Sequence, residues 1–184
     1  MNLLDLTSYK ARGFLLKEES YVNFDLPPYF VFSKLLKTLS AKIEGKPLSN
    51  FYASDKELKP CKREGVNYKI LSNKDGKYAW RPFQLIHPAL YVSLVHEITE
   101  TSNWTLIRNR FKELKSPNIE CFSLPVVSET KKSDRAEQIL HWWEEVEQQS
   151  ISLGLEYDYV FHTDIVDCYG AIYTHSIAWA LHGK

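Results

Sequence analysis

The sequence predicts an α+β fold that is mainly helical, and three observations support this prediction. Apolar residues recur at helical spacing in several segments of the 184-residue chain, a pattern typical of amphipathic helices. Two β-prone runs flank Asp75-Gly76 and indicate a β-hairpin. Residues 155–164 alternate in period two, as a half-buried strand does. A chain of this length is expected to form one domain with its own core, or two small lobes.

The first clear helical pattern is "LPPYFVFSKLLKTLSAKIEGKP", residues 26–47. Pro27 and Pro28 favour a helix start, because the first turn of a helix does not need their missing N–H groups. Gly45 and Pro47 favour its end. The expected apolar stripe is Phe32, Leu35, Leu36, Leu39 and Ile43. This segment is predicted to be a helix.

The hairpin signal lies in "VNYKILSNKDGKYAWRPFQL", residues 66–85. Short apolar and aromatic runs flank "SNKDGK", in which Asp75-Gly76 is a turn signal. Residues 66–82 are therefore predicted to form the hairpin, with Lys74 near its tip.

Two further helices and a short strand are expected after the hairpin. "HPALYVSLVHEIT" places Pro88 in a helical first turn, and "NWTLIRNRFKEL" continues with apolar residues in helical register. "CFSLPVV", residues 121–127, is predicted to be a short strand in which Pro125 favours an edge or an end.

The next segment, "SDRAEQILHWWEEVEQQSISL", has the spacing of a capped amphipathic helix. Asp134 and Glu137 stand in capping-box spacing. The expected buried stripe is Ile139, Leu140, Trp143, Val146 and Ile151. "LEYDYVFHTD" then alternates as a strand that ends on the carboxylate of Asp164.

Composition limits the classes of protein to consider. With 44% hydrophobic and 25% charged residues the chain reads as globular. It has no signal-peptide pattern at its start and no apolar run of about 18 residues, so we expect a cytoplasmic protein with no membrane partner. Cys61, Cys121 and Cys168 form no C-x-x-C pair, which argues against zinc and against a disulfide framework.

The net charge of zero hides an asymmetry along the chain. Residues 56–81 contain eight basic and three acidic side chains, whereas residues 134–167 contain nine acidic and one basic. One region would attract phosphates, and the other could hold cations. The alternative is two ordinary solvated faces.

The residues that follow the predicted strand suggest a specific chemistry. Two-metal phosphoryl transfer needs rigidly held carboxylates, and the end of a strand provides that rigidity. Asp164 would be a metal ligand there, with the carbonyl of Ile165 as another. Backbone N–H groups near Asp167 and Cys168 could receive a triphosphate, and Tyr169 could stand against the sugar. In the alternative, Asp164 caps the turn and Tyr169 packs in the core.

The run "TDIVDCYGAI" resembles motif A of reverse transcriptases, in which a Tyr or Phe follows the aspartate by five residues. The longer ending, "TDIVDCYGAIYTHSIAWALHGK", is similar to bacterial reverse transcriptases of the unknown groups, many of them associated with phage defence. "YAWRPFQLIHP" resembles the arginine-containing fingers motif of the same superfamily. The resemblance covers roughly residues 66–184. It implies fingers over 66–133 and the start of a palm over 134–184. The residue pattern alone predicts a helical region over 1–65.

The resemblance also implies roles for the matching positions. Asp164 would be the first catalytic ligand of two Mg²⁺ ions, and Ile165 would offer its carbonyl to the second ion. Tyr169 would disfavour the 2′-OH of a ribonucleotide. Arg81 would contact the phosphates or base of the incoming dNTP, with Lys74 as a weaker candidate. The expected partners are a dNTP, an RNA template, and a nucleic-acid or protein primer.

The chain departs from the family pattern in one respect. Reverse transcriptases complete the metal site with an aromatic-x-Asp-Asp hairpin, and this sequence contains no Asp-Asp pair. We therefore interpret it as an N-terminal fragment with an incomplete palm, which should bind Mg²⁺ weakly, should not polymerise, and could self-associate at the open sheet edge. The alternative function is a non-catalytic nucleic-acid-binding or assembly module. Both functions would use the predicted basic helix positions Arg108, Arg110, Lys112 and Lys115 to track a nucleic-acid backbone, unless these form an ordinary solvated face.

Overall fold

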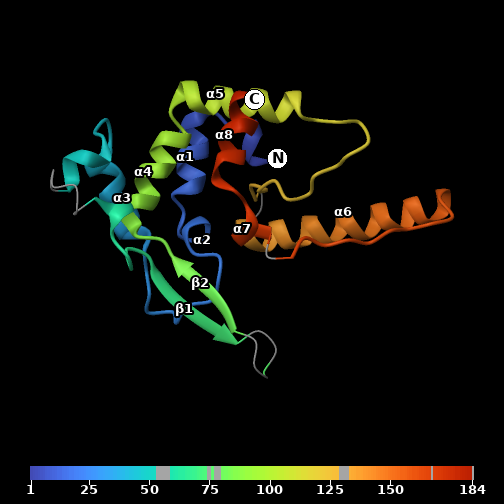
Figure 1. Ribbon diagram of the computed structural model, residues 1–184, viewed down its shortest axis with the longest axis horizontal. Helices are drawn as coiled ribbons and strands as arrows, with labels where there is room; N and C mark the ends of the chain where they lie inside the picture. The colour runs from blue at the N-terminus through green and yellow to red at the C-terminus, as the bar shows by residue number, and fades with distance from the viewer. Residues whose placement is uncertain (53–58, 74–75, 77–79, 129–132, 167, 184) are drawn as a thin grey trace. The chain divides into compact units, whose positions relative to one another are not determined.

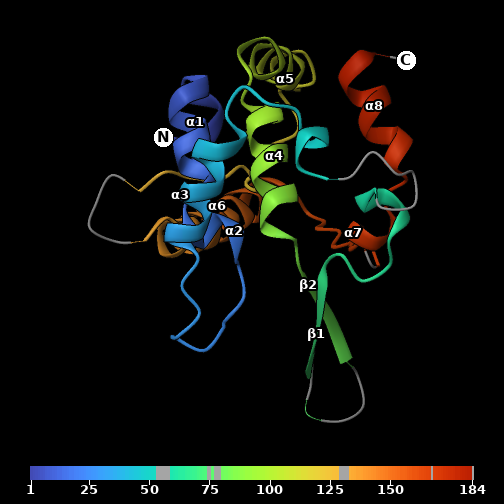
Figure 2. The ribbon, with the colours of Figure 1, turned by 90° about the vertical axis from the view of Figure 1, so that its left-hand side faces the viewer.

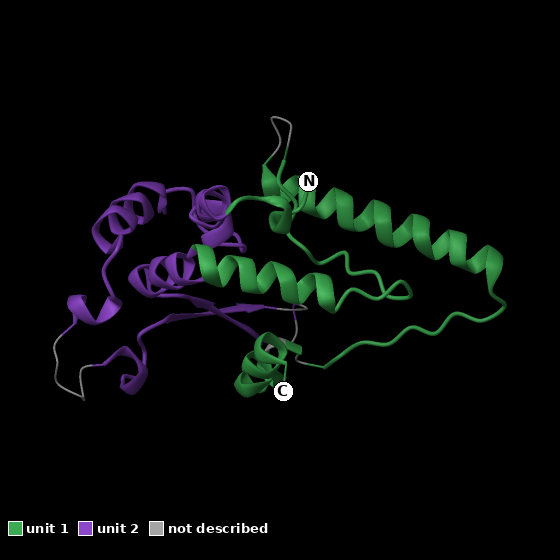
Figure 3. Cartoon of the chain, turned by 90° about the horizontal axis from the view of Figure 1, so that it is seen from above, with its two compact units in different colours: residues 1–7, 101–184 green, residues 8–100 purple. Residues whose placement is uncertain are grey.

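The computed structural model describes residues 1–52, 59–73, 76, 80–128, 133–166 and 168–183, and for Tyr169 the backbone alone. Its described part is α+β and mostly helical, with a two-stranded antiparallel sheet (Figure 1). The chain divides into two units, which Figure 3 colours separately. Unit 1 comprises residues 1–7 and 101–184, and unit 2 comprises residues 8–100. The predicted fold class is confirmed at this level.

Unit 2 combines helices with the β-hairpin. Its described elements are α1 (Ser8–Leu15), α2 (Glu18–Tyr21), α3 (Ser33–Ile43), η2 (Leu48–Phe51), η4 (Pro60–Lys62), β1 (Tyr68–Asn73), β2 (Trp80–Leu85) and α4 (Pro88–Ile98). Helices α3 and α4 pack against each other (Figures 1 and 2). Pro88 lies at the start of α4, and the His87 side chain caps that helix by accepting the N–H of Ala89 at 3.3 Å. The prediction for this helix is confirmed.

The core of unit 2 lies between α2, α3 and α4. Leu36 and Val92 are fully buried there, with Ile43 and Tyr21 beside them. The hydroxyl of Tyr91 donates to the carbonyl of Leu15 at 2.5 Å. Burial and the neighbouring Tyr21 raise the pKa of Tyr91 to about 12. These residues hold the helices together by apolar packing and by hydrogen bonds that satisfy buried polar groups.

Helix α3 begins later than the sequence predicted. Pro27 instead forms a turn, in which its carbonyl accepts the N–H of Phe30 at 3.0 Å, and the helix runs from Ser33 to Ile43. A carboxylate oxygen of Glu18 accepts the backbone N–H of Ser33 at 3.1 Å and also its hydroxyl. The start is thus set by a contact from α2, which a local pattern cannot reveal. At the other end, Gly45 has a φ of 67°.

The β-hairpin is confirmed. Strands β1 and β2 pair antiparallel, with Tyr68 opposite Leu85 and Asn73 opposite Trp80. In the turn, Gly76 has a φ of 77°, and its N–H donates to the side-chain oxygen of Asn73 at 2.9 Å. Glycine is favoured here because other residues rarely adopt this left-handed conformation. The predicted tip residue, Lys74, lies outside the described residues.

Unit 1 contains η1 (Leu3–Asp5), α5 (Thr101–Glu113), α6 (Asp134–Glu156), α7 (Cys168–Ala171) and α8 (Thr174–His182). Helix α5 matches the predicted segment and packs against α8. The buried indole of Trp104 on α5 donates its N–H to the carbonyl of Leu6 at 3.0 Å. Helix α8 begins at Thr174, and its N-cap residue Tyr173 makes no side-chain cap bond.

The predicted strand over residues 121–127 is wrong. Only an isolated antiparallel bridge forms there among the described residues, between Asn2 and Val126. The N–H of Leu3 donates to the carbonyl of Pro125 at 2.8 Å, and the N–H of Val127 donates to the carbonyl of Met1 at 3.0 Å. Proline at position 125 has no N–H to extend a ladder, which is consistent with so short a pairing.

Helix α6 forms where it was predicted, but its expected buried stripe is wrong. Ser133 caps the helix by accepting the N–H of Ala136 at 3.2 Å. Asp134 is the only buried residue among the described residues of α6, whereas Ile139, Leu140, Trp143 and Ile151 are exposed and Val146 is half-buried. Periodicity defines an apolar face of a helix, and burial further requires a neighbour to cover it.

The predicted strand over residues 155–164 is also wrong. Helix α6 extends to Glu156, and residues 157–166 have no regular secondary structure. Tyr159 is 93% exposed and Phe161 is 90% exposed. Figure 3 shows the segment running from the end of α6 back towards α7. A strand needs a partner for its backbone hydrogen bonds, and alternation in the sequence does not supply one.

In the part of the chain that the structure describes, no helix is long and apolar enough to cross a membrane.

Candidate functional site

Asp164 lies in an exposed segment that leads into α7. The carboxylate oxygen Oδ1 of Asp164 accepts the N–H of Ile165 at 2.8 Å. Ile165 is also exposed. A carboxylate in this setting keeps its second oxygen and open solvent access for a cation or a substrate. The same local hydrogen bond is also what a turn-capping aspartate makes, so this contact agrees with both interpretations of Asp164.

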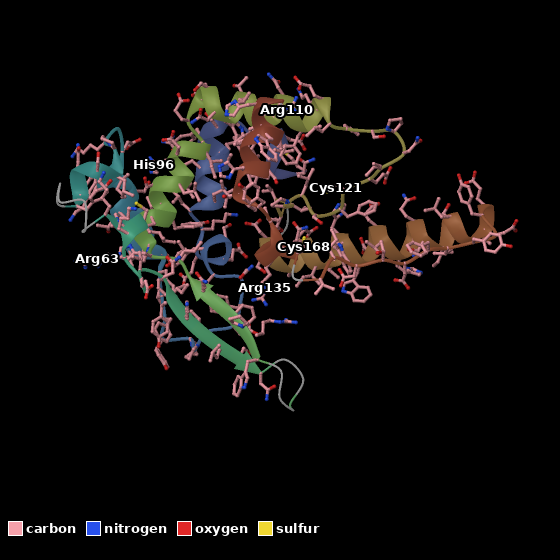
Figure 4. The ribbon with its side chains drawn as sticks, in the orientation of Figure 1. Arg63, His96, Arg110, Cys121, Arg135 and Cys168 are labelled. Atoms are coloured by element: carbon pink, nitrogen blue, oxygen red, sulfur yellow. The ribbon has the colours of Figure 1, made fainter. Side chains whose placement is uncertain are left out.

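The residues after Asp164 begin the short helix α7. Cys168 is its first residue and is an exposed free cysteine, labelled in Figure 4. Tyr169 lies within α7, and its side chain is outside the described part of the structure, as is all of Asp167. The roles predicted for Asp167, Cys168 and Tyr169 in nucleotide binding therefore stay predictions.

The donor atoms at Asp164 suit Mg²⁺ in kind but not in number. Carboxylate and carbonyl oxygens, as at Asp164 and Ile165, are the ligands that Mg²⁺ prefers. Among the described residues, however, no group of three or more His, Cys, Asp or Glu side chains could hold a metal ion. One carboxylate and one neighbouring carbonyl do not make an octahedral site. Weak Mg²⁺ binding is the expected behaviour of this segment.

Arg81 is an exposed residue of β2 in unit 2. It pairs with Ser72 in the hairpin register, two positions from the pair Ile70–Phe83. Because side chains alternate along a strand, Arg81 lies on the same face as Phe83, whose ring stacks on Phe24 with centroids 5.0 Å apart. Lys69 has the opposite parity and lies on the other face. The hairpin thus divides these two basic side chains between its faces.

The four basic positions predicted to track nucleic acid differ in their surroundings. Arg108 is half-buried, and its Nε atom has no hydrogen-bond partner among the described residues. Lys112 is exposed on α5, and Lys115 is exposed beyond the end of this helix. Positions 108 and 112 share a helix face at i and i+4, whereas position 110 points elsewhere. The four do not form one continuous basic face.

Arg110 has a structural task within unit 1. Its Nε donates to the carbonyl of Ala180 at 2.8 Å, and its guanidinium pairs with Glu113 (Figure 4 labels Arg110). Ala180 lies in the last turn of α8, where backbone carbonyls lack intrahelical partners. The arginine therefore caps α8 and ties it to α5. Contact with a phosphate would require this side chain to leave these partners.

A hollow of about 490 Å³, which was not predicted from the sequence, lies at the base of the hairpin in unit 2. Apolar, amide and basic side chains line it together: Leu48, Tyr52, Pro60, Cys61, Arg63, Gly65, Val66, Asn67, Lys69, Gln84 and Leu90. Its size falls in the range of small-molecule pockets. The excess of basic residues over 56–81 indicated a site that attracts anions. We assigned this site to the hairpin, whereas the hollow also includes the loop before the hairpin.

The described groups with a shifted pKa belong to the packing of unit 2. Burial lowers the pKa of His96, with a contribution from the charge of Arg12. A hydrogen bond from the Ser33 side chain lowers the pKa of Glu18. Perturbed pKa values often mark active sites, but ion pairs and buried networks also cause them. Here the neighbours are helix residues, so these shifts indicate structural roles.

A scan against models of known protein families and a search of curated proteins both give no match to this chain. The resemblance to reverse transcriptases therefore depends on the motif residues themselves.

Proposed function

We propose that this chain forms the fingers and the first part of the palm of a bacterial reverse transcriptase, an RNA-directed DNA polymerase of a phage-defence type. The observation that carries the proposal is the Asp-x-x-x-x-Tyr segment, which leaves Asp164 exposed and leads into two short helices. The basic antiparallel hairpin that carries Arg81 supports it. The proposed regions remain 1–65, 66–133 and 134–184.

Under this proposal each site residue has a separate task. Asp164 and the carbonyl of Ile165 would hold Mg²⁺, which supplies charge neutralisation at the reacting phosphate in two-metal enzymes. Arg81 and Lys74 would bind the triphosphate of a dNTP by charge-assisted hydrogen bonds. Tyr169 would exclude the 2′-OH. The backbone N–H groups at Asp167 and Cys168 would contact phosphate oxygens.

The proposed reaction is in-line attack of a primer hydroxyl on a dNTP with release of pyrophosphate. It needs more carboxylates than the Asp164 segment provides, and the described residues do not supply them. We therefore expect the 184-residue chain alone to be inactive. Activity is expected only from a chain that adds an aromatic-x-Asp-Asp hairpin.

A second candidate function is a non-catalytic nucleic-acid-binding module. It is favoured by the outer face of the hairpin, where Leu71 and Trp80 are both 64% exposed and Lys69 is exposed further along the same face, with Leu71 between Lys69 and Trp80. A face that carries an aromatic ring and a cation at separate positions suits a single strand of nucleic acid, whose bases stack and whose phosphates pair with cations. This function needs no carboxylate set.

The test is dNTP incorporation on an RNA template with Mg²⁺, by the 184-residue chain and by the same chain extended with a segment that carries an aromatic-x-Asp-Asp hairpin. We expect incorporation by the extended chain only. Asp164→Ala should reduce it to background, and Asp158→Ala, a matched change in the same exposed segment, should leave it unchanged. Incorporation by the 184-residue chain, or activity that survives Asp164→Ala, would contradict the proposal. No incorporation by either chain, with RNA binding lost in Trp80→Ala, would favour the second function.

The same assay tests the proposed role of Tyr169. If the ring excludes the 2′-OH, Tyr169→Ala should raise ribonucleotide incorporation by the extended chain, because the clash is removed. Tyr169→Phe keeps the ring and is the matched control. Equal discrimination between dNTP and rNTP in all three proteins would count against this role.

A further inference from the structure

The hollow at the base of the hairpin is built entirely from unit 2. Its walls come from η2, from the segment that contains η4 and leads into β1, from both strands and from α4. Arg63, labelled in Figure 4, belongs to that segment. Gly65 turns the chain there with a φ of 73°. The left-handed backbone at Gly65 lets the segment fold beside β1, which is how residues 60–69 come to line one side of the hollow.

The charged groups of the lining are both basic. Arg63 and Lys69 are exposed at the hollow, and among the described residues that line it none is acidic. Over residues 59–69 the sequence has four basic side chains and one acidic one, Glu64. A concave surface with one sign of charge attracts counter-ions. The arginine can also bind phosphate oxygens in a bidentate manner.

The polar groups between these cations have a defined arrangement. Gln84 is the register partner of Lys69, so the two side chains are neighbours on the outer face of the hairpin. Asn67 accepts the N–H of His87 at 3.0 Å, and its amide nitrogen donates to Gln84 at 3.5 Å. These bonds leave the amide nitrogen of Gln84 as a donor for a ligand.

The remaining lining is apolar and aromatic. Leu48, Val66 and Leu90 contribute apolar side chains, and Tyr52 contributes a ring. A flat apolar surface with one or two fixed amides suits a heteroaromatic ring, which can pack on the tyrosine and bond through its edge. An anion without an attached ring would not contact these apolar and aromatic side chains.

We propose that the hollow is a binding site for a nucleoside phosphate, with the phosphate at Arg63 and Lys69 and the base against Tyr52 and Gln84. This site goes beyond the proposed polymerase function. It requires neither Asp164, which is in unit 1, nor Arg81, which lies on the other face of the hairpin.

The first experiment is calorimetric titration of the 184-residue chain with AMP, adenosine and inorganic phosphate. We expect AMP to bind with one-to-one stoichiometry and more tightly than the other two probes, because each of them fills half of the site. Arg63→Gln and Lys69→Gln should each weaken AMP binding about tenfold or more, since each removes a charge-assisted hydrogen bond. Lys62→Gln is the matched control, because Lys62 is exposed beside Arg63 but does not line the hollow.

The second experiment uses the cysteines as reporters of position. Cys61 lines the hollow, whereas Cys121 and Cys168 are exposed in unit 1. AMP should therefore slow the alkylation of Cys61 by N-ethylmaleimide and leave the other two rates unchanged. Mass spectrometry of peptides reports the three rates in one sample.

Equal AMP affinity in Arg63→Gln, Lys69→Gln and Lys62→Gln would overturn the proposal, as would unprotected Cys61 at saturating AMP. Phosphate binding as tightly as AMP would overturn the assignment of the base, and adenosine binding as tightly would overturn that of the phosphate.

Titration of Asp164→Ala and Arg81→Gln separates this site from the polymerase proposal. Retained AMP binding in both supports the hollow whatever the outcome of the incorporation assay, and loss of binding in either would overturn its location.

Discussion

Helices α3 and α6 have similar sequence patterns but opposite surroundings. Both carry an apolar stripe at helical spacing, and the stripe of α6 was predicted to be buried. In unit 2, α3 packs on α4 and buries Leu36 and Ile43. In unit 1, α6 is longer, yet four positions of its predicted stripe are exposed and Val146 is half-buried. The difference shows that a stripe specifies which side of a helix is available for packing, whereas a neighbouring element decides whether that side is buried.

The polar contacts of the two helices differ in the same way. Along unit 2, side chains join separate elements: Arg12 of α1 donates to the hydroxyl of Thr99 at 2.9 Å, and Ser40 of α3 contacts His96 of α4 at 2.8 Å. The described side-chain bonds from α6 to other segments come from its first turns, where Asp134 and Gln138 accept backbone N–H groups of residues 126–128. Most of α6 is therefore stabilised by its own backbone hydrogen bonds.

The largest effect on the free energy of unfolding is expected from a matched pair of leucines, one on each helix. Leu36 is 0% exposed on α3, and Leu155 is 87% exposed near the end of α6. Leu36→Ala should lower the free energy of unfolding by about 2–5 kcal/mol, because it leaves a cavity. Leu155→Ala should change it by less than about 0.5 kcal/mol. Urea denaturation followed by circular dichroism measures both, and equal losses would contradict the assigned difference in burial.

A smaller effect is expected at a tryptophan pair within unit 1. Trp104→Phe keeps an aromatic ring but removes the indole N–H that bonds the Leu6 carbonyl. An unsatisfied buried carbonyl costs about 1–3 kcal/mol of stability. Trp143→Phe is the control, because Trp143 is exposed on α6. A loss of stability in Trp143→Phe as large as that in Trp104→Phe would contradict the assignment of Trp143 to an exposed face of α6.

Loss of the side-chain contact between α5 and α8 should lower the free energy of unfolding by about 0.5–1.5 kcal/mol. Arg110→Gln removes the bond to the Ala180 carbonyl. The expected result is faster amide hydrogen exchange over α8 without a change over α3. Lys112→Gln, an exposed change on the same helix, should leave both helices unaltered. Unchanged exchange in Arg110→Gln would mean that this arginine does not hold α8, and would leave it available for nucleic acid.

The smallest effect concerns the pH dependence of unit 2. Burial lowers the pKa of His96 in the folded state, and the charge of Arg12 lowers it further, whereas Glu44 opposes this. The unfolded chain therefore binds more protons than the folded one as the pH falls below about 6.5, so stability decreases over that window until the folded pKa is reached. Denaturation at about pH 7.5 and about pH 5.5 should show this decrease. The decrease should be smaller in His96→Gln and retained in His162→Gln, because His162 is an exposed residue of unit 1. An identical decrease in both variants would contradict the assignment.

The candidate sites were predictable from the sequence to different degrees. Asp164 was predicted at the end of a strand, but it lies in an exposed segment without regular secondary structure, because no second strand pairs with that segment among the described residues. The task of Arg110 was not predictable, since its partner Ala180 is 70 residues away in the chain. The hollow was missed for the same reason. Its lining joins residues 48–69 to Gln84 and Leu90, and only folding brings these together.

The elements whose hydrogen bonds are local were predictable from the sequence. Helices α4, α5 and α6 and the β1–β2 hairpin form where their periodicity, proline position and turn glycine indicated, because helix bonds join residues four apart and a tight turn sets the pairing of its own strands. Other features depend on neighbours that are distant in the sequence, and these follow from tertiary packing. Tertiary packing sets the start of α3 and leaves most of the α6 stripe exposed. It also leaves residues 157–164 without a strand partner among the described residues. Burial and strand pairing each require a second segment in space, and a pattern within one segment cannot say whether that second segment is there.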